Sequence, residues 1–275
     1  MPRTVLGVVI TSDAEELRQI AIAVARDAAA YVADARAFDS HVTGPIGDVP
    51  MAGTTTKSTP TDLVTAVDKA TEARIVAALS ERRPGDGFLA EEGTGVASTT
   101  GVQWVIDPID GTTNFVYGYP AYGVSVAAVD EASGESIAGA VVDVVRGELF
   151  SAAREVGAWV DNDPISLGPG PANLATALIG TGFAYARATR AEQAAVLLRL
   201  LPAVRDIRRG GSAALDMCWA AAGRVDAYFE RGTAPWDRAA GILVAREVGL
   251  RTELVGDLVW VAHPRIADDL LALIS

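Results

Sequence analysis

Apolar residues recur every three or four positions in two stretches of the N-terminal part of the chain. Residues 12–37 show this spacing and open with Ser12 and Glu15, which form a capping-box pattern, so a helix is predicted there. A second helix is predicted for residues 61–81, where the same spacing ends at a Pro-Gly pair. Residues 41–59 between them are rich in Gly, Thr and Pro without periodicity, which indicates a long loop of the kind that often serves as a lid or binding loop.

Shorter apolar runs follow, and they predict strands rather than helices. Residues 88–91 and 102–107 are largely apolar until an acidic residue closes each run. Three more runs are separated by short polar turns and comprise residues 123–129, 137–142 and 148–152. This spacing is typical of an antiparallel meander.

In the second half of the chain, strand-like and helical patterns alternate. Strands are predicted for residues 175–180, 204–208, 225–229 and 258–262, and helices for residues 191–201, 212–222, 237–248 and the C-terminal end. Ser212 is placed to cap one of these helices, and Gly223 and Gly249 are placed to end two of them. We therefore expect an α+β or mixed α/β protein in which helices pack on sheets.

Composition narrows the classes of function. Half of the 275 residues are hydrophobic, enough for a substantial core, and the single cysteine, Cys218, rules out an internal disulfide. With only His41 and His263 beside it, neither a Cys/His zinc cage nor a Ser-His-Asp triad is expected, and both histidines are predicted to be surface or packing residues. No apolar run reaches the roughly 20 residues of a membrane helix and no secretory signal pattern is present, so we expect a cytoplasmic protein without a membrane partner. The net charge of −12 argues against direct nucleic-acid binding.

The chemistry concentrates in residues 104–114, which read WVIDPIDGTTN. Asp107 closes an apolar strand and is kept extended by the proline that follows it, and Asp110 comes three residues later across a turn. Two carboxylates can thus point into one small volume. The backbone N–H groups of Gly111 and Thr112 come next, where a helix or turn begins and an anion such as phosphate binds well. A purely structural turn is the alternative, because Asp, Pro and Gly are common turn residues.

Further acidic residues lie at the ends of neighbouring predicted elements. Glu91 and Glu92 close a strand, Asp62 and Asp68 lie on the second helix, and Asp237 begins a late helix. Each has a structural alternative, such as a solvated turn, a favourable charge at a helix N-terminus or an N-cap. Magnesium is held in proteins by a few carboxylates together with water and substrate phosphates. Because an acidic chain repels a phosphate ester unless bound cations reverse the local field, phosphate chemistry in this chain requires metal ions.

Together these segments resemble the inositol monophosphatase family, and the similarity is closest to its bacterial SuhB-type branch. The resemblance extends from about Lys57 to Val248. Its motifs are Lys57–Asp68 (KSTPTDLVTAVD), Glu91-Glu92, Trp104–Phe115 (WVIDPIDGTTNF), Gly211–Cys218 (GSAALDMC), Asp226–Glu230 (DAYFE) and Pro235-Trp236-Asp237. The resemblance implies a magnesium-dependent phosphoric monoester hydrolase, an enzyme that cleaves inositol 1-phosphate to inositol and phosphate with a metal-activated water.

The resemblance also assigns roles to individual residues. The implied metal ligands, for two or three magnesium ions, are Glu91, Asp107, the backbone carbonyl of Ile109, Asp110 and Asp237. The implied catalytic residues are Glu91, Thr112 and Asp68. Glu91 and Thr112 would position the attacking water, and Asp68 would hold Thr112 in place. The implied contacts to phosphate and to the sugar or inositol are Asp110, Gly111, Thr112, Gly211, Ser212, Ala213, Glu230 and Asp237. Lys57 would belong to a mobile loop near the metals.

The same resemblance implies a layered α/β/α/β/α fold, a homodimer and inhibition by lithium. Residues 1–275 would form one catalytic domain. Its N-terminal half, residues 12–152, would hold helices, a sheet and most of the metal ligands, and its C-terminal half, residues 153–275, would complete the substrate site.

Two departures from the family pattern and several rival functions stay open. Gly210 stands directly before Gly211, where the family pattern has a bulkier residue, so this loop is expected to be looser. Arg205, Arg208 and Arg209 form a small basic cluster, which is either a solvated strand edge or a contact with an anionic ligand or partner. Fructose 1,6-bisphosphate, histidinol phosphate and nucleotide bisphosphates are alternative substrates, although Glu230 favours the hydroxyls of inositol over a second phosphate. A SuhB-like regulator that binds a transcription-machinery partner and a structural cation-binding module are the alternatives of other classes.

Overall fold

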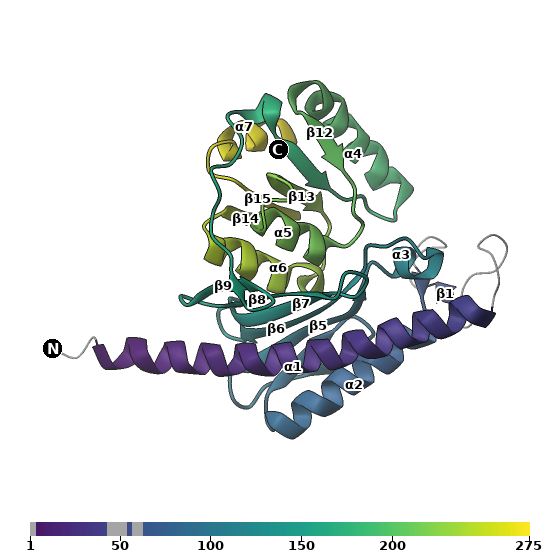
Figure 1. Cartoon of the computed structure of the whole chain (residues 1–275), viewed down its shortest axis with the longest axis vertical. Helices are drawn as coiled ribbons and strands as arrows, with labels where there is room; N and C mark the ends of the chain where they lie inside the picture. Colours follow the sequence, from purple (N-terminus) through teal and green to yellow (C-terminus); the bar gives the residue numbers. More distant parts are fainter. Residues whose placement is uncertain (1–3, 43–53, 57–62) are drawn as a thin grey trace.

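The described residues, 4–42, 54–56 and 63–275 of a computed structural model, form five layers in the order helices, sheet, helices, sheet, helices (Figure 1). Helices α1 and α2 cover the outer face of the first sheet, α5 and α6 lie between the two sheets, and α4 and α7 cover the second sheet. The helices have the bounds α1 Thr4–Val42, α2 Ala66–Arg82, α3 Thr112–Tyr117, α4 Arg187–Leu200, α5 Ala213–Ala221, α6 Pro235–Val248 and α7 Ala267–Ile274, with 3₁₀ turns η1 Leu174–Thr176 and η2 Leu201–Ala203. The predicted mixed α+β class and its α/β/α/β/α layering are confirmed.

The first sheet has eight strands in the order β10-β9-β8-β7-β6-β5-β3-β4. Their bounds are β3 Gly87–Ala90, β4 Gly95–Val96, β5 Val102–Asp110, β6 Gly123–Asp130, β7 Ser136–Asp143, β8 Glu148–Ala153, β9 Gly157–Val160 and β10 Asp163–Pro164. Strands β6, β7 and β8 form the predicted antiparallel meander, and β3 runs parallel to β5. Strands β9 and β10 extend this sheet to Pro164.

Both faces of this sheet are covered, and side chains along each strand alternate between the two cores. On β5, Trp104 and Ile106 pack toward α1 and α2, whereas Val105 packs toward α5 and α6. A strand buried on both faces reads as a continuous apolar run instead of an alternating one. This explains why β5 reads as an uninterrupted apolar run from Trp104 to Ile106, directly before Asp107.

The second sheet has five strands in the order β12-β11-β13-β15-β14. Their bounds are β11 Leu178–Thr181, β12 Asp206–Arg208, β13 Ala227–Arg231, β14 Arg251–Val255 and β15 Leu258–Ala262. Strand β11 is parallel to both β12 and β13, and the other pairs are antiparallel. The edge strand β14 was not predicted, because it is half-exposed and its charged residues interrupt any apolar pattern.

The first helix is longer than predicted. It begins at Thr4, eight residues before Ser12, so the capping box expected at Ser12 and Glu15 is wrong. No proline occurs between Pro2 and Pro45, and the apolar residues before Ser12 continue the helix without an interruption. The helix also runs past His41 to Val42, which shortens the predicted loop at its N-terminal side.

The second helix begins later than predicted, at Ala66. Thr65 caps it, because its hydroxyl accepts the N–H groups of Val67 and Asp68 and the Asp68 carboxylate accepts the Thr65 N–H. Strand β2, Leu63–Val64, occupies the start of the expected helix and pairs with β1, Thr55–Thr56, inside the expected loop. Lys57 and Asp62 lie outside the described residues.

The composition led to expectations about the two histidines and about membrane-spanning helices. His263 is a packing residue as expected: it is buried, and its ring nitrogens contact the Gly168 carbonyl and the Arg265 N–H. The side chain of His41 lies outside the described part of the chain. Among the helices of the described ranges, none combines the length and the hydropathy that a bilayer crossing requires.

Candidate functional site

A one-residue bulge at the end of β5 turns Asp107 and Asp110 into the same pocket. On β6, Ser125 pairs with Asp107 and Gly123 pairs with Asp110, so three steps along β5 match two along β6. In a regular strand, side chains three residues apart point to opposite faces, and the extra residue cancels this alternation. Ile109 accordingly packs into the core under α1 and α2, while both aspartates line the pocket.

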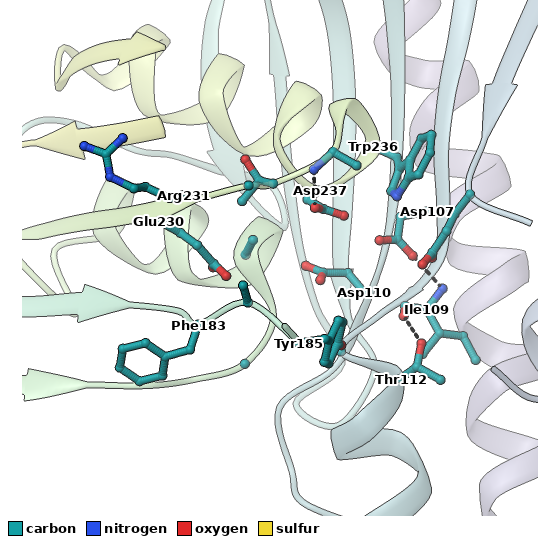
Figure 2. Close-up of a pocket in the computed structure, with 18 of the residues that line it drawn as sticks. Asp107, Ile109, Asp110, Thr112, Phe183, Tyr185, Glu230, Arg231, Trp236 and Asp237 are labelled. Atoms are coloured by element: carbon teal, nitrogen blue, oxygen red, sulfur yellow. Dashed lines mark hydrogen bonds between the residues drawn. The ribbon is translucent and has the colours of Figure 1, made fainter. Parts of the chain in front are cut away.

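The start of α5 fixes the Asp110 carboxylate. Its Oδ2 accepts the Ser212 hydroxyl at 2.6 Å and the Ala214 N–H at 2.7 Å. Ser212 is also the N-cap of α5, as predicted, and its Oγ accepts the Leu215 N–H. Because both bonds go to Oδ2, the other oxygen of Asp110 is left toward the pocket (Figure 2). Ser212 itself is fully buried, and it acts on the cavity through its hydrogen bond to Asp110.

Two further carboxylates reach the pocket from other elements. Glu91 follows β3, whose parallel pairing with β5 brings the carboxyl ends of both strands to one edge, and its side chain hydrogen-bonds Asp107. Asp237 lies in the first turn of α6, where its Oδ2 accepts the Ala234 N–H at 2.6 Å. Asp237 therefore supports the helix start without being its N-cap. Figure 2 shows Asp237, Asp107 and Asp110 on facing walls of one cavity.

The cavity has a volume of about 330 Å³ and lies where the ends of strands from both sheets meet the start of α6. Of the residues predicted for the site, it is lined by Glu91, Asp107, Ile109, Asp110, Gly111, Thr112, Gly211, Ala213, Glu230 and Asp237. Residues far apart in the sequence therefore come together as the motifs suggested. Lys57 lies outside the described residues, and Asp68 reaches the site from behind, through Thr112.

Burial and mutual repulsion dominate the electrostatics of the cavity. Burial raises the pKa of Asp107 well above its ordinary value, and the neighbouring carboxylates raise it further. Burial has the same effect on the pKa of Asp237. It raises the pKa of Asp110 to about 7, although the hydrogen bonds from Ser212 and Ala214 lower it. Three carboxylates crowded in this way favour either protons or bound cations.

The donor set suits a hard divalent cation. The cavity offers carboxylate oxygens from four acidic residues and the main chain of Ile109, and magnesium and calcium prefer oxygen ligands. In the part of the chain that the structure describes, no three acidic, histidine or cysteine side chains converge closely enough to form a ready-made cage. Carboxylates that span a cavity in this manner leave room for water and substrate oxygens around a bound hard cation.

Thr112 is held by two acceptors below the cavity. Its hydroxyl lies 3.0 Å from Asp68 Oδ1 and 3.0 Å from the Ile109 carbonyl. Asp68 is fully buried, and its other oxygen takes part in the capping box of α2. The contact expected between Asp68 and Thr112 is therefore present.

Gly111 must be a glycine for two reasons. Its φ of 96° lies in the left-handed region, and a Cβ at this position would lie 3.0 Å from the Ala121 carbonyl and 3.1 Å from the Gly211 carbonyl. The tight turn brings the backbone of Gly111 and Thr112 to the cavity wall, where their N–H groups were expected to face an anion.

Glu230 closes the side of the cavity opposite Asp107. It comes from β13, accepts the buried Tyr228 hydroxyl, and extends toward Asp110 in Figure 2. Burial raises its pKa, which the Tyr228 hydrogen bond and the charge of Arg209 lower. A Cβ on Gly182 would lie 1.9 Å from Glu230 Oε2, so a larger residue there would displace this carboxylate.

The structure separates the basic cluster suggested by the sequence. Arg205 and Arg208 are exposed on the strand edge, where they bond the Thr176 carbonyl and Asp206. Arg209 instead lines the cavity and acts electrostatically on Glu230. The solvated-edge interpretation therefore holds for the first two arginines, and the third is placed to meet an anionic ligand.

Sequence reasoning missed the segment after β11 that forms another wall of the cavity. It comprises Phe183, Ala184 and Tyr185, and Figure 2 shows Tyr185 beside Asp110. The residues that follow β13, from Arg231 to Ala234, also line the cavity and were not singled out. The only available signal was their position after predicted strands of one sheet, because neither segment carries a distinctive motif.

Comparisons with known proteins agree with this geometry. The model of the Inositol monophosphatase family matches residues 13–265. The chain is 48% identical over 282 residues to the inositol-1-monophosphatase of Mycobacterium leprae, covering 96% of this chain and 95% of that protein. It is 41% identical over 217 residues to a Vibrio cholerae protein named Nus factor SuhB, covering 78% of this chain and 80% of that one. The solved structure of Mycobacterium tuberculosis SuhB superposes with a TM-score of 0.77 at 43% identity, covering 94% of this chain and 95% of that chain.

Proposed function

The chain belongs to the inositol monophosphatase family, and from this premise we propose that it is a magnesium-dependent phosphatase that hydrolyses inositol 1-phosphate to inositol and phosphate. The observation that carries the proposal is the convergence of Glu91, Asp107, Asp110 and Asp237 on one cavity beside Thr112. A cavity this acidic repels a phosphate ester unless cations fill it. The acidic cavity therefore supports bound cations, and the phosphate chemistry of the family requires them.

Five groups of this chain would hold two or three magnesium ions: Glu91, Asp107, the Ile109 carbonyl, Asp110 and Asp237. When bound, such ions supply positive charge that polarises the phosphoryl group and lowers the pKa of a water molecule. Homodimer formation and inhibition by lithium belong to the same proposal. Membership of the family is the basis for both of these proposals.

The chain's own residues orient the reactants. Thr112 directs its hydroxyl proton to Asp68 or to the Ile109 carbonyl, so its lone pairs are left to accept a hydrogen bond from water on the cavity side. Glu91 accepts a second hydrogen bond from that water, which points its oxygen at phosphorus. The Gly111 and Thr112 N–H groups receive the phosphate oxygens. The water oxygen bonds to phosphorus while the ester bond on the opposite side breaks, and the proton that the water loses ends on the departing inositol oxygen.

Glu230 and the free oxygen of Asp110 face the alcohol part of the substrate. Carboxylates accept hydrogen bonds from ring hydroxyls, which favours a polyol such as inositol. Arg209 lies near Glu230, so a substrate with a second phosphate is repelled less than Glu230 alone would dictate. Fructose 1,6-bisphosphate, histidinol phosphate and nucleotide bisphosphates therefore belong in the same assay.

Phosphate release from these compounds tests the proposed function. With inositol 1-phosphate, fructose 1,6-bisphosphate, histidinol phosphate and 3′-phosphoadenosine 5′-phosphate as substrates, we expect the highest kcat/KM for inositol 1-phosphate. Release should require Mg²⁺ and stop in EDTA, since the carboxylates need cations to accept the phosphate. A folded protein that releases phosphate from none of the four compounds would exclude the enzyme and favour a partner-binding role.

A regulatory role is the second candidate, and the relative named Nus factor SuhB is the observation that favours it. In this hypothesis the chain binds a protein of the transcription machinery through a surface away from the cavity. Pull-down with purified transcription proteins tests it, with the wild type and Asp107→Asn compared. Binding that survives this substitution would show that the partner surface is separate from the catalytic cavity. If the wild type binds none of these proteins, the regulatory hypothesis is refuted and the phosphatase remains as the proposed function.

Replacing Ser212 with alanine is expected to shift the pH dependence of activity. The substitution removes the 2.6 Å hydrogen bond that lowers the Asp110 pKa, so the acid limb of the kcat/KM profile should move to higher pH. Loss of this bond and of the α5 cap should cost about 1–2 kcal/mol of stability. Phosphate release from pH 5.5 to 9 and thermal denaturation measure the two effects. Ser80→Ala, an exposed serine on α2, is the control, and equal profiles for both variants would contradict the role of Ser212.

A further inference from the structure

Helix α2 carries two buried carboxylates one helical turn apart, and each binds a segment next to the cavity. Asp68 is 0% exposed and Glu72 is 4% exposed. Residues at i and i+4 lie on the same face of a helix, where two negative charges repel each other. Asp68 has a role in the site through Thr112. Glu72 has none in the mechanism described above, and its burial therefore needs another explanation.

Glu72 binds the turn that carries Glu91. Its Oε2 accepts the Glu92 N–H at 2.6 Å, and its Oε1 accepts the Thr94 N–H at 3.1 Å and the Thr94 hydroxyl at 2.6 Å. The turn is closed on its other side by hydrogen bonds between Ala90 and Thr94 and between Gly93 and Ala90. The carboxylate thus holds the first and the third residue after Glu91, while strand β3 holds the residue before it.

A buried carboxylate loses its hydration, and this desolvation costs free energy that a neutral side chain at the same position would not lose. Among the described residues, Glu72 forms no ion pair, and all three of its donors are neutral. A buried charge is tolerated when hydrogen bonds satisfy it, and backbone N–H groups bind a carboxylate more strongly than they bind a neutral acceptor. An ionised group at this position therefore fixes the turn more rigidly than an apolar or amide side chain would.

We propose that Glu72 is a positioning residue that holds Glu91 in its working orientation. This inference rests on the proposed function, in which Glu91 contacts both the cations and the attacking water. Through Asp68 and Glu72, one face of α2 sets the relative positions of Thr112 and Glu91, the two residues between which that water lies. Partners of this kind, which orient a metal ligand without touching the metal, typically contribute about 10- to 100-fold to metal affinity or activity.

The test is Glu72→Gln, which changes a single atom. The glutamine oxygen can replace Oε1 and keep both bonds to Thr94, but its NH₂ group then faces the Glu92 N–H, and two donors repel each other. We expect kcat for inositol 1-phosphate to fall about 10- to 100-fold at a fixed Mg²⁺ concentration while KM for the substrate stays within about twofold. The Mg²⁺ concentration for half-maximal activity should rise, and excess Mg²⁺ should restore part of kcat.

A readout independent of activity is hydrogen exchange of the metal-free protein. The Glu92 amide should exchange about tenfold faster in Glu72→Gln than in the wild type, because it has lost its acceptor. Mg²⁺ affinity measured by calorimetry should fall together with this protection. A role in folding alone would lower Tm and leave the Mg²⁺ dependence unchanged, and that result would overturn the proposal.

Two matched variants complete the experiment. Glu81→Gln makes the same chemical change at an exposed position of α2 and should leave kcat, Mg²⁺ affinity and exchange as in the wild type. Thr94→Val removes only the hydroxyl bond to Oε1 and should show a smaller effect in the same direction. Wild-type activity with no loss in Glu72→Gln would refute the positioning role and leave the function intact. An inactive wild type would refute the function, while exchange and calorimetry would still report on the turn.

Discussion

Asp107→Asn is expected to stabilise the metal-free protein while abolishing its activity. Asp107 is 2% exposed, and its pKa is raised well above the ordinary value by burial and by the carboxylates around it. Asparagine keeps the size and the hydrogen-bonding oxygen of the side chain, including an acceptor for the Ile109 N–H, which lies 3.0 Å from Oδ1. It removes the charge that the neighbouring acids repel, so the folded state is relieved of repulsion that the extended unfolded chain does not experience.

The two effects differ in sign and in size. Removing one charge from a crowded functional cluster typically adds about 1–2 kcal/mol of stability, which for a chain of this length raises Tm by roughly 2–6 °C. Loss of Asp107 as a proposed cation ligand should lower kcat/KM about 1,000-fold or more, since several kcal/mol of transition-state stabilisation depend on the cations. The rise in Tm that Mg²⁺ gives the wild type should disappear in the variant.

Thermal denaturation in EDTA and in Mg²⁺, combined with phosphate release, measures all three effects. The matched control is Asp143→Asn, because Asp143 is as deeply buried but is satisfied by the Arg146 side chain and by the N–H groups of Val145 and Arg146. This control should lower Tm in both conditions and keep the Mg²⁺ response. If Asp107→Asn lowered Tm in EDTA by as much as the control does, repulsion would not dominate the cavity.

The positions of the cavity acids could be predicted because each lies at or near the end of an element. Glu91 follows β3, Asp110 ends its parallel neighbour β5, and Asp237 lies in the first turn of a helix after a proline. The bulge that aligns Asp107 with Asp110 could not be predicted, since it depends on which residues of β6 pair with β5. The residues around Pro108 indicated that the two aspartates can share one small volume, and the strand pairing supplied the physical reason.

Residues that act through long-range contacts gave no sequence signal. Glu72 looks like an ordinary polar residue of an amphipathic helix, and its partners lie 20 and 22 residues away. Tyr185 follows a strand of the second sheet in a segment without a motif, and only the stacking of both sheets around α5 and α6 brings it to the cavity. The start of α1 was misplaced for a different reason: a capping-box pattern shows that a helix can begin at a residue and does not end a helix that already passes through it.

The stability of the protein should respond to pH in opposite directions with and without Mg²⁺. Asp110 has a pKa of about 7 in the folded chain, against an ordinary value of 3.8. The folded chain therefore binds this proton more tightly than the unfolded chain does, and the free energy of unfolding falls as the pH rises from about 4 to about 7. For Asp110 alone the fall is on the order of 4 kcal/mol, and the raised pKa values of Asp107 and Asp237 act in the same direction.

Mg²⁺ should reverse this trend, because a cation and a proton compete for the same carboxylates. Its affinity rises as the carboxylates lose their protons, and tighter binding to the folded state raises Tm. We expect Tm in EDTA to be higher at pH 5.5 than at pH 8, and the increase in Tm caused by Mg²⁺ to be much larger at pH 8.

Carboxylates with lowered pKa values, such as Glu15 and Glu148, lose their stabilising effect only below about pH 4.5 and do not affect this window. Asp110→Asn should flatten the EDTA curve, and a wild-type Tm that rises from pH 5.5 to 8 in EDTA would contradict the raised pKa values on which the cation site depends.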